Sequence, residues 1–382
     1  MESTMNLFFR ATAALALLAA SLPALAASAT VARAFTFKPE SNAGLKLQNL
    51  VGDVRVERGA GPGIEVAATT TVEAATEDEA KRLAGLVDFR SKDVGPGSRF
   101  DVRLPPEHFP KVYWQDGASH WWAASYVQYL GERIRISGAK DADTRVVRVD
   151  LVIRAPAGAK LEVSNILGDS SAAGFSGDLK LDGTSGTLRS DGGDGEVYLD
   201  SGSGAVIVAG HRGRVKADTG SGSVKISNCE CDILADTGSG SVDVQKGKGK
   251  VSADTGSGRV KVEDFAGPLL ADTGSGGVSA RGLSDVRALE LDTGSGSVDI
   301  EGDLSALAHV DIDTGSGSVT LRSSPGQPSL ELRIETGSGG VDVEAPGASV
   351  RESDDVTIVK MKDGLGSGVI DTGSGSVKLN FP

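Results

Sequence analysis

A carboxylate recurs at regular intervals along the C-terminal half of this chain, and its spacing is the first feature that could do chemistry. The phrase DTGSGS, with small changes, starts at Asp218, Asp236, Asp254, Asp272, Asp292, Asp313, Glu335 and Asp371, with weaker copies at Asp182 and Asp200. Between residues 182 and 272 the step is 18 residues. Acids repeated at a fixed spacing can bind calcium between successive turns of a stacked structure, so calcium is the sharpest chemical hypothesis.

The place of the acid within the phrase argues against a calcium site. Calcium-binding nonapeptide repeats place the acid after the glycines, whereas here it precedes them and the matching position holds a valine such as Val224 or Val242. Two carboxylates about 4.8 Å apart repel by about 0.9 kcal/mol in water, and amide hydrogen bonds of roughly 1.5–3 kcal/mol offset that repulsion. We therefore predict no metal and no cofactor, and keep a calcium-stabilised surface repeat as an alternative.

We interpret the phrase as a structural corner between two strands. Its two glycines are expected to supply positive φ, and its hydroxyls to satisfy turn amides and carbonyls. The residues assigned to this role are Asp218, Gly220, Gly222, Asp236, Gly238, Gly240, Asp254, Gly256 and Gly258.

A cluster of aromatic residues between positions 109 and 130 is the second feature with chemical potential. It contains all three tryptophans and three of the four tyrosines. Aromatic rings can stack on sugars or peptides, and they can also plug the open end of a repeat stack, which is the interpretation that we favour. The candidate partner-binding residues are Tyr113, Trp114, Trp121, Trp122 and Tyr126.

The remaining reactive residues do not form a recognisable catalytic pattern. Cys229 and Cys231 stand two apart, and on a straight strand a bridge between them would be strained, so we expect two packed thiols and leave their pairing open. The repeats contain only two scattered histidines, His211 and His309, and no Ser-His-Asp set or nucleotide-binding loop. We predict no enzyme; the alternative is a polysaccharide-acting β-helix enzyme, because polysaccharide lyases use parallel β-helices.

The elements that position these residues follow from a period-2 pattern around each acid. Around Asp218, for example, Val215 and Ala217 precede the acid, and Val224 and Ile226 follow it, with polar residues between the members of each pair. Such alternation indicates two short strands, each with one face inward. The sequence predicts an all-β, single-chain parallel β-solenoid (β-helix) with about 18-residue coils and two short strands per coil.

The two corners of a coil differ in length. The glycine corner always spans seven steps between inward residues, while all insertions fall in the opposite corner, which therefore behaves as a tolerant surface loop. Leu45, Leu47, Val54 and Val56 obey the same seven-step rule, which predicts a coil of this type before the aromatic cluster.

The pattern divides the chain into four parts. Residues 1–26 are a predicted signal peptide, with Arg10 before an apolar run and an Ala24-Leu25-Ala26 cleavage site. Residues 27–73 hold the N-terminal strands and the first coil. Residues 74–150 form a small α+β insertion, with a helix from Thr76 to Val87, strands and the aromatic cluster as a cap. Residues 151–382 form the repeat solenoid.

Composition limits the range of partners. The formal net charge is −13, and an acidic surface of this kind repels nucleic acid. No run of about 18 apolar residues follows the signal peptide, so we expect no integral helical membrane protein.

The passage VDLVIRAPAG at residues 149–158, the segment Leu161-Glu-Val163 and the TGSGSVxV units resemble the bacterial putative-adhesin family of β-strand-repeat proteins. The resemblance covers roughly residues 35–382, apart from residues 109–130. It implies an exported cell-envelope protein of the periplasm or cell surface, with an adhesin-like binding or scaffolding role. The expected partner is an envelope glycan or protein, with self-association through the solenoid ends as a further expectation. The resemblance supplies no catalytic residues.

Overall fold

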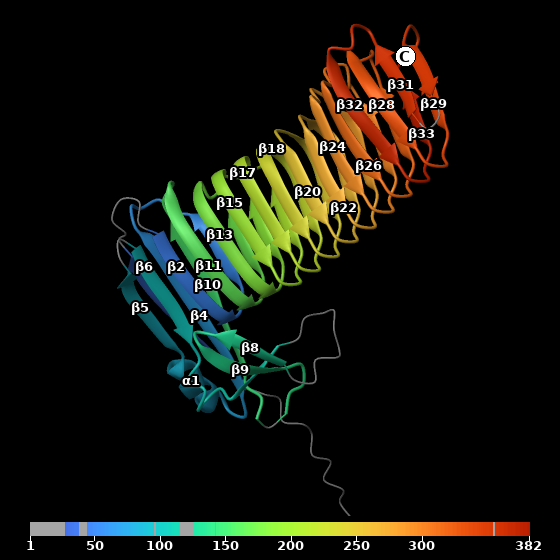
Figure 1. Cartoon of the computed structure of the whole chain (residues 1–382). Helices are drawn as coiled ribbons and strands as arrows, with labels where there is room; N and C mark the ends of the chain where they lie inside the picture. The colour runs from blue at the N-terminus through green and yellow to red at the C-terminus, as the bar shows by residue number, and fades with distance from the viewer. Residues whose placement is uncertain (1–26, 38–43, 95–96, 115–124, 142, 354–355) are drawn as a thin grey trace, which may run out of the picture.

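The computed structural model describes residues 27–37, 44–94, 97–114, 125–141, 143–353 and 356–382. The predicted signal peptide, Trp121 and Trp122 lie outside these ranges. The described chain is nearly all β, with a single helix and one large, mostly parallel sheet (Figure 1). The all-β prediction is therefore confirmed.

The N-terminal part is a layer of longer, antiparallel strands. It contains β1 (Ala27–Phe37), β4 (Ile64–Ala74) and β10 (Val146–Ala155), with β4 antiparallel to both neighbours. Helix α1 (Glu77–Leu86) packs on β1 and β4 through Ala80, Leu83 and Ala84. Thr76 caps it, since its Oγ1 accepts a hydrogen bond from Glu79 N at 3.2 Å, as the sequence predicts.

Several of the described residues of the aromatic cluster belong to a separate small sheet next to this layer. Its strands are β7 (Lys111–Tyr113), β8 (Ser125–Tyr129) and β9 (Glu132–Ser137), with β9 in the centre. Tyr113 N donates to Arg145 O, just before β10, at 2.9 Å. The small sheet thus lies at the N-terminal end of the molecule (Figure 1), and its role as a cap stays a prediction.

The remaining strands form two rows. The first row contains β6 (Gly97–Arg103), β2 (Gly44–Val51), β11 (Ala159–Leu167), β13 (Gly177–Ser185), β15 (Asp194–Ser201), β17 (Arg212–Thr219), the second half of β18 (Val224–Thr237), β20 (Val251–Thr255), β22 (Leu269–Thr273), β24 (Ala288–Thr293), β26 (His309–Thr314), β32 (Gly366–Thr372) and β28 (Leu330–Thr336). These strands are parallel, and β5 (Asp88–Val94) adds an antiparallel edge beside β6.

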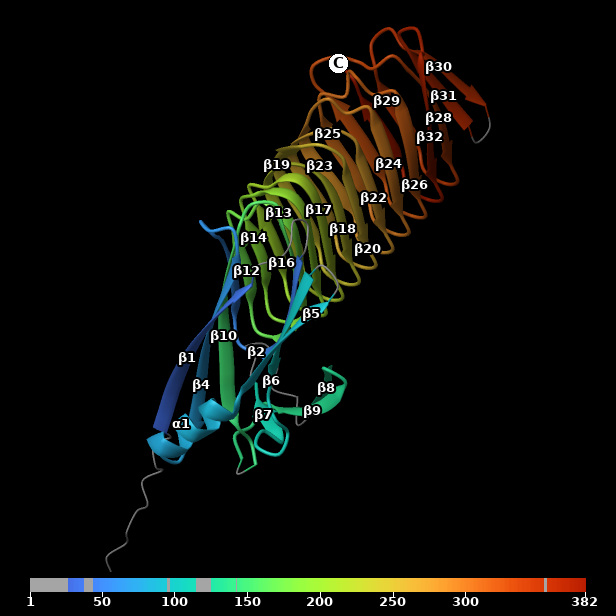
Figure 2. The same cartoon turned by 90° about the vertical axis from the view of Figure 1, so that its left-hand side faces the viewer.

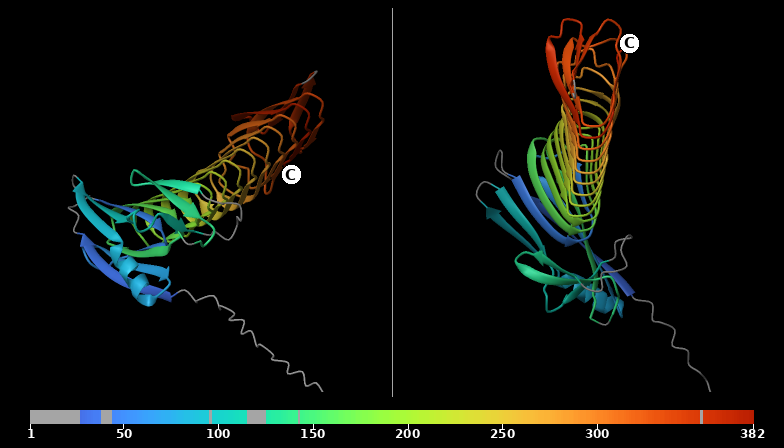
Figure 3. Two further views of the ribbon diagram at one scale, coloured as in Figure 1. Left: turned by 90° about the horizontal axis from the view of Figure 1, so that it is seen from below. Right: turned by 45° about the vertical axis from the view of Figure 1, so that its right-hand side comes forward.

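The second row contains the opposite strand of each coil. It runs β3 (Val54–Arg58), β12 (Ser170–Ala173), β14 (Leu188–Asp191), β16 (Val206–Ala209), the first half of β18, β19 (Val242–Lys248), β21 (Val260–Ala266), β23 (Val278–Leu283), β25 (Val298–Gly302), β27 (Val319–Ser323), β33 (Val377–Asn380) and β29 (Val341–Glu344). Beyond β3 this row continues into β10, β4 and β1. The blue N-terminal strands fan away from the green and yellow coils (Figure 3).

The register follows the sequence repeat. Leu179 pairs with Val197, and Val197 pairs with Val215, so each partner lies 18 residues further along. Leu45 pairs with Leu161 and Val54 pairs with Ser170, so β2 and β3 continue the two rows toward the N-terminal part.

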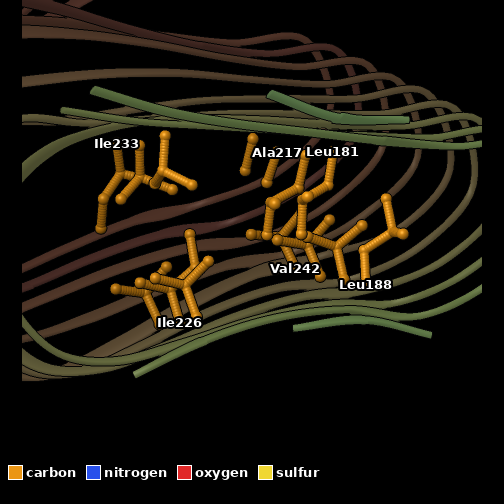
Figure 4. Close-up of a cluster of buried hydrophobic side chains, with 14 of the residues drawn as sticks. Leu181, Leu188, Ala217, Ile226, Ile233 and Val242 are labelled. Atoms are coloured by element: carbon orange, nitrogen blue, oxygen red, sulfur yellow. The ribbon is translucent and has the colours of Figure 1, made fainter. Parts of the chain in front are cut away.

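The core lies between the two rows. Leu181, Ala217 and Ile233 point from one row toward Leu188, Ile226 and Val242 on the other (Figure 4). All six are at most 2% exposed. Burying a leucine or isoleucine side chain contributes about 1.5–3 kcal/mol, so this aliphatic core between the two rows stabilises each coil.

The last coils do not stack in chain order. Strand β26 pairs with β32, and β32 pairs with β28, so the final coil of the chain lies between two earlier ones. The loop at residues 324–329 joins β27 to β28 and has to pass this inserted coil. Beyond β28 the first row gains β31 (Val356–Met361) and β30 (Ser349–Ser353), both in antiparallel pairings.

Candidate functional site

The acids of the repeated phrase form one continuous column on the outside of the first row. Asp218 pairs with Asp236, and Asp254 pairs with Asp272. The column runs from Asp182 to Asp313, continues through Asp371 and ends at Glu335, because the last coil is inserted. We call these residues the acid column.

Several carboxyl groups of the acid column have raised pKa values. Partial burial, and then the charge of neighbouring carboxylates, raises the pKa of Asp182, Asp218, Asp254 and Asp313 above its ordinary value. A shallow groove of about 420 Å³ follows the column between Asp254 and Asp313. In the described ranges, no group of three or more His, Cys, Asp or Glu side chains is arranged to hold a metal ion.

The face that carries the acid column differs in charge from the face of the second row. Two residues before each acid stand Lys180, Tyr198 and Lys216 in the early coils, and then Leu234, Ser252, Leu270, Glu290 and Asp311. On the second row, cations pair with acids of adjacent coils: Arg281 and Arg322 both contact Asp299, at 3.3 and 2.6 Å. The later coils therefore have one acidic face and one ion-paired face.

The threonine of the phrase performs the predicted hydrogen bonding inside the corner. Thr237 is buried, its Oγ1 donates to Gly222 O at 2.9 Å, and it accepts from Gly240 N at 3.0 Å. The same pair of bonds recurs at Thr219, Thr255 and Thr273. Each of these four hydroxyls thus ties its own corner to the preceding coil, whereas the hydroxyls of the later copies, such as Thr293 and Thr314, donate within their own corner.

The prediction that the corner glycines supply positive φ is wrong. Positive φ occurs instead at the opposite corner, at Gly210, Asn228, Lys246 and Asp264, each 18 residues after the last. The residues to which this correction applies are Gly220, Gly222, Gly238, Gly240, Gly256 and Gly258, none of which has positive φ.

Close stacking of backbones explains the corner glycines. A Cβ on Gly240 would lie 1.7 Å from Gly222 O, and one on Gly238 would lie 2.5 Å from Gly220 O. A real side-chain atom cannot occupy either position. Glycine is therefore required because successive corners touch, and not because the chain turns through a left-handed conformation.

The described candidate aromatic residues share one small sheet. Tyr113 on β7 pairs with Ser137, and Tyr126 on β8 pairs with Arg135, so both rings lie on one face of β9. Tyr126 is 51% exposed, with the Arg133 guanidinium 4.0 Å from its ring centroid, and Lys140 Nζ lies 5.0 Å from the Tyr113 ring centroid. These two tyrosines and Arg133, Arg135 and Lys140 define what we call the aromatic-basic face.

Trp114 has a different environment from the two tyrosines. It is half-buried and packs against the core, and its Nε1 has no hydrogen-bond partner among the described residues. Trp121 and Trp122 fall outside the described ranges. The sequence analysis identifies the aromatic residues but misses Arg133 and Arg135. The signal that could have found them is the alternation of these arginines with isoleucines along β9.

The sequence leaves the pairing of Cys229 and Cys231 open, and the structure shows them paired rather than as two packed thiols. Cys229 and Cys231 form a disulfide, with Cα atoms 5.3 Å apart, and both residues are buried. The chain is not straight at this point, because Asn228 has a φ of 52° at the corner within β18. The turn brings the two Cα atoms within the ordinary range for a disulfide.

No protein-family model matches this chain, and no curated protein sequence matches it. A solved structure of a "putative cell adhesion protein" from Clostridium sporogenes aligns over 92% of this chain and 99% of its own length, with 9% identity and a TM-score of 0.17. A TM-score this low carries no argument about fold or function, so the family resemblance stays a prediction. None of the described helical residues forms a helix long and apolar enough to cross a membrane.

Proposed function

We propose that this chain is an exported β-solenoid of the bacterial cell envelope, in the periplasm or at the cell surface, that acts as a non-enzymatic, adhesin-like binding or scaffolding module. The 18-residue register of the two rows supports the solenoid with two strands per coil. The predicted signal peptide supports export.

The aromatic-basic face carries the binding part of the proposal. It places exposed arginines beside two tyrosine rings in a protein whose formal net charge is −13. Tyrosine rings stack on sugars, and guanidinium groups bind carboxylate or phosphate groups in a bidentate fashion. The face therefore suits an envelope glycan that carries acidic groups, presented at one end of a long rod (Figure 1).

A binding assay with variants of this face tests the proposal. Tyr126→Ala combined with Arg133→Ala should strongly reduce retention of the mature chain on acidic cell-wall glycan. Leu234→Ala is the matched control. Leu234 is also exposed, at 46%, but it lies on β18 of the first row, which is distant in sequence from the small sheet. Trp121→Ala and Trp122→Ala extend the test to the rest of the aromatic cluster.

The outcomes separate the alternatives. Unchanged retention in all variants, with envelope extracts and purified glycans, would remove the aromatic-basic face from the proposal. New reducing ends or unsaturated products after incubation with glycans would instead support the polysaccharide-acting alternative.

A further inference from the structure

The C-terminal end of the two rows is uneven. The second row ends at β29, which pairs only with β33 among the described strands. The first row continues past β28 by two strands, β31 and then β30, and β30 pairs only with β31 among the strands that the structure describes. Figure 2 shows β30 and β31 beyond β28 on one side, with β29 on the other. The end is therefore a step with an overhang and a recess of two strands each.

The step leaves apolar side chains and strand edges partly uncovered. Val341 and Val343 of β29 face the core but are only half-buried. Val350 of β30 pairs with the buried Val359, so it lies on the core-facing side of the sheet, and it is nevertheless 47% exposed. An edge strand with an exposed apolar face is a template for pairing with another chain.

A second copy of this chain has the shape that fills the step. A twofold axis parallel to the strands places the overhang of one copy in the recess of the other, and the reverse. Strand β30 is parallel to β28, because two antiparallel pairings separate them. Since the two rows run in opposite directions, β30 of the second copy would pair antiparallel with β29 of the first.

The charges of the two edge strands are complementary in this arrangement. When Val343 and Val350 lie opposite each other on the core side, the outward side brings Arg351 of one copy across from Asp342 of the other. Arg351 is exposed and has no ion-pair partner among the described residues. A shift of the register by two residues places Arg351 opposite Glu344 instead, so both registers pair it with an acid. Cross-strand pairs of opposite charge stabilise a sheet.

We infer that two copies of this chain associate tail to tail through the C-terminal step, with β29 of each copy paired to β30 of the other. The inference is independent of the aromatic-basic face, which lies at the opposite end of the rod (Figure 1). The dimer would present that face at both of its distant ends.

Charge reversal in solution tests the interface. Wild-type protein should show a concentration-dependent monomer–dimer equilibrium in sedimentation velocity. Arg351→Asp should raise the dimer dissociation constant on the order of tenfold, because two symmetric pairs become repulsive. Asp342→Arg should act similarly, although Asp342 also pairs with Lys378 at 3.0 Å. Combining the two substitutions should restore part of the association.

Matched valine variants test the apolar part. Val350→Lys should abolish the dimer, whereas Val369→Lys should leave it unchanged, because Val369 is 42% exposed but lies on the outer side of β32. Circular dichroism and melting curves confirm folding of each variant. A wild-type chain that stays monomeric at all concentrations would overturn the inference, as would a dimer indifferent to both Arg351→Asp and Val350→Lys.

Discussion

At the scale of single residues, the T-G-S-G corner joins coils as well as strands. The hydroxyl of Thr237 donates to Gly222 of the previous coil and accepts from Gly240 of its own. Residue 240 has to be glycine because Gly222 O already occupies the space that a Cβ would need. Thr237 and Gly240 are thus both explained by a contact with Gly222 of the preceding coil.

A single methyl group tests this explanation. Gly240→Ala should lower the free energy of unfolding by about 1–3 kcal/mol or more, because the added Cβ forces two stacked backbones apart. Gly340→Ala is the control, since Gly340 also stands in a glycine corner but a Cβ added there would have no heavy atom within 4 Å among the described residues. Chemical denaturation measures both, and equal stability of the two variants would refute close stacking.

At the scale of elements, the acid column makes stability depend on pH. The folded state holds the pKa of Asp254 above its ordinary value of 3.8, first through partial burial and then through Asp236 and Asp272. Between those two pKa values the folded state binds more protons than the unfolded state. The contribution of Asp254 to stability therefore increases as pH falls through its folded pKa, and stays constant once the pH is below 3.8.

Two asparagine variants isolate this effect. Asp254→Asn should be more stable than wild type at neutral pH, and the difference should shrink as the pH approaches 3.8. Asp303→Asn should do the opposite, because hydrogen bonds from Ser305 lower the pKa of Asp303, so its contribution is lost on acidification. Denaturant titrations over this pH range provide the measurement. Parallel pH profiles for both variants would contradict the argument.

A melting experiment on the acid column distinguishes a structural corner from a calcium site. We expect the melting temperature of the mature chain to be the same with a calcium chelator as with added calcium, since Thr hydroxyls and backbone amides already satisfy the corner. The same comparison on Asp254→Asn serves as the control. A large downward shift in chelator, absent in the variant, would favour the calcium-stabilised alternative.

At the scale of the whole molecule, the C-terminal residues of the chain do not lie at the end of the two strand rows. Strand β32 pairs on both sides with β26 and β28, and β33 pairs with β27 and β29. Phe381 is fully buried, and its backbone N donates to Glu344 O at 2.8 Å. The last residues of the sequence are therefore held inside the stack, and the hairpin of β30 and β31 forms the physical end.

Amide hydrogen exchange should reproduce that order. In a stacked structure, stability depends on contacts with neighbouring units, so strands with two neighbours open less often than strands with one. Residues 377–380 should exchange more slowly than residues 349–353, although they lie closer to the C-terminus. Peptide-level mass spectrometry measures both segments, and faster exchange in residues 377–380 would show that the inserted coil does not persist in solution.

The local pattern of this protein could be predicted from sequence. The alternation around each acid, the 18-residue step and the seven-step spacing of Leu45, Leu47, Val54 and Val56 identify the strands, because period-2 burial depends only on neighbouring residues. Helix α1 is visible for the same reason, since its cap and its buried residues are all local.

The arrangement of equivalent units was decided only by the tertiary structure. Ile312, Ile334 and Ile370 are the same residue at the same place in three coils, so the sequence contains no signal for which of them pair. Three other features depend on contacts between segments that are distant in sequence. They are the need for glycine in the corners, the shared face of Tyr113 and Tyr126, and the step formed by β29 and β30. The residues of each repeat determine the strands of its own coil. Because the repeats are alike, the order in which the last coils stack is determined by packing at the end of the stack.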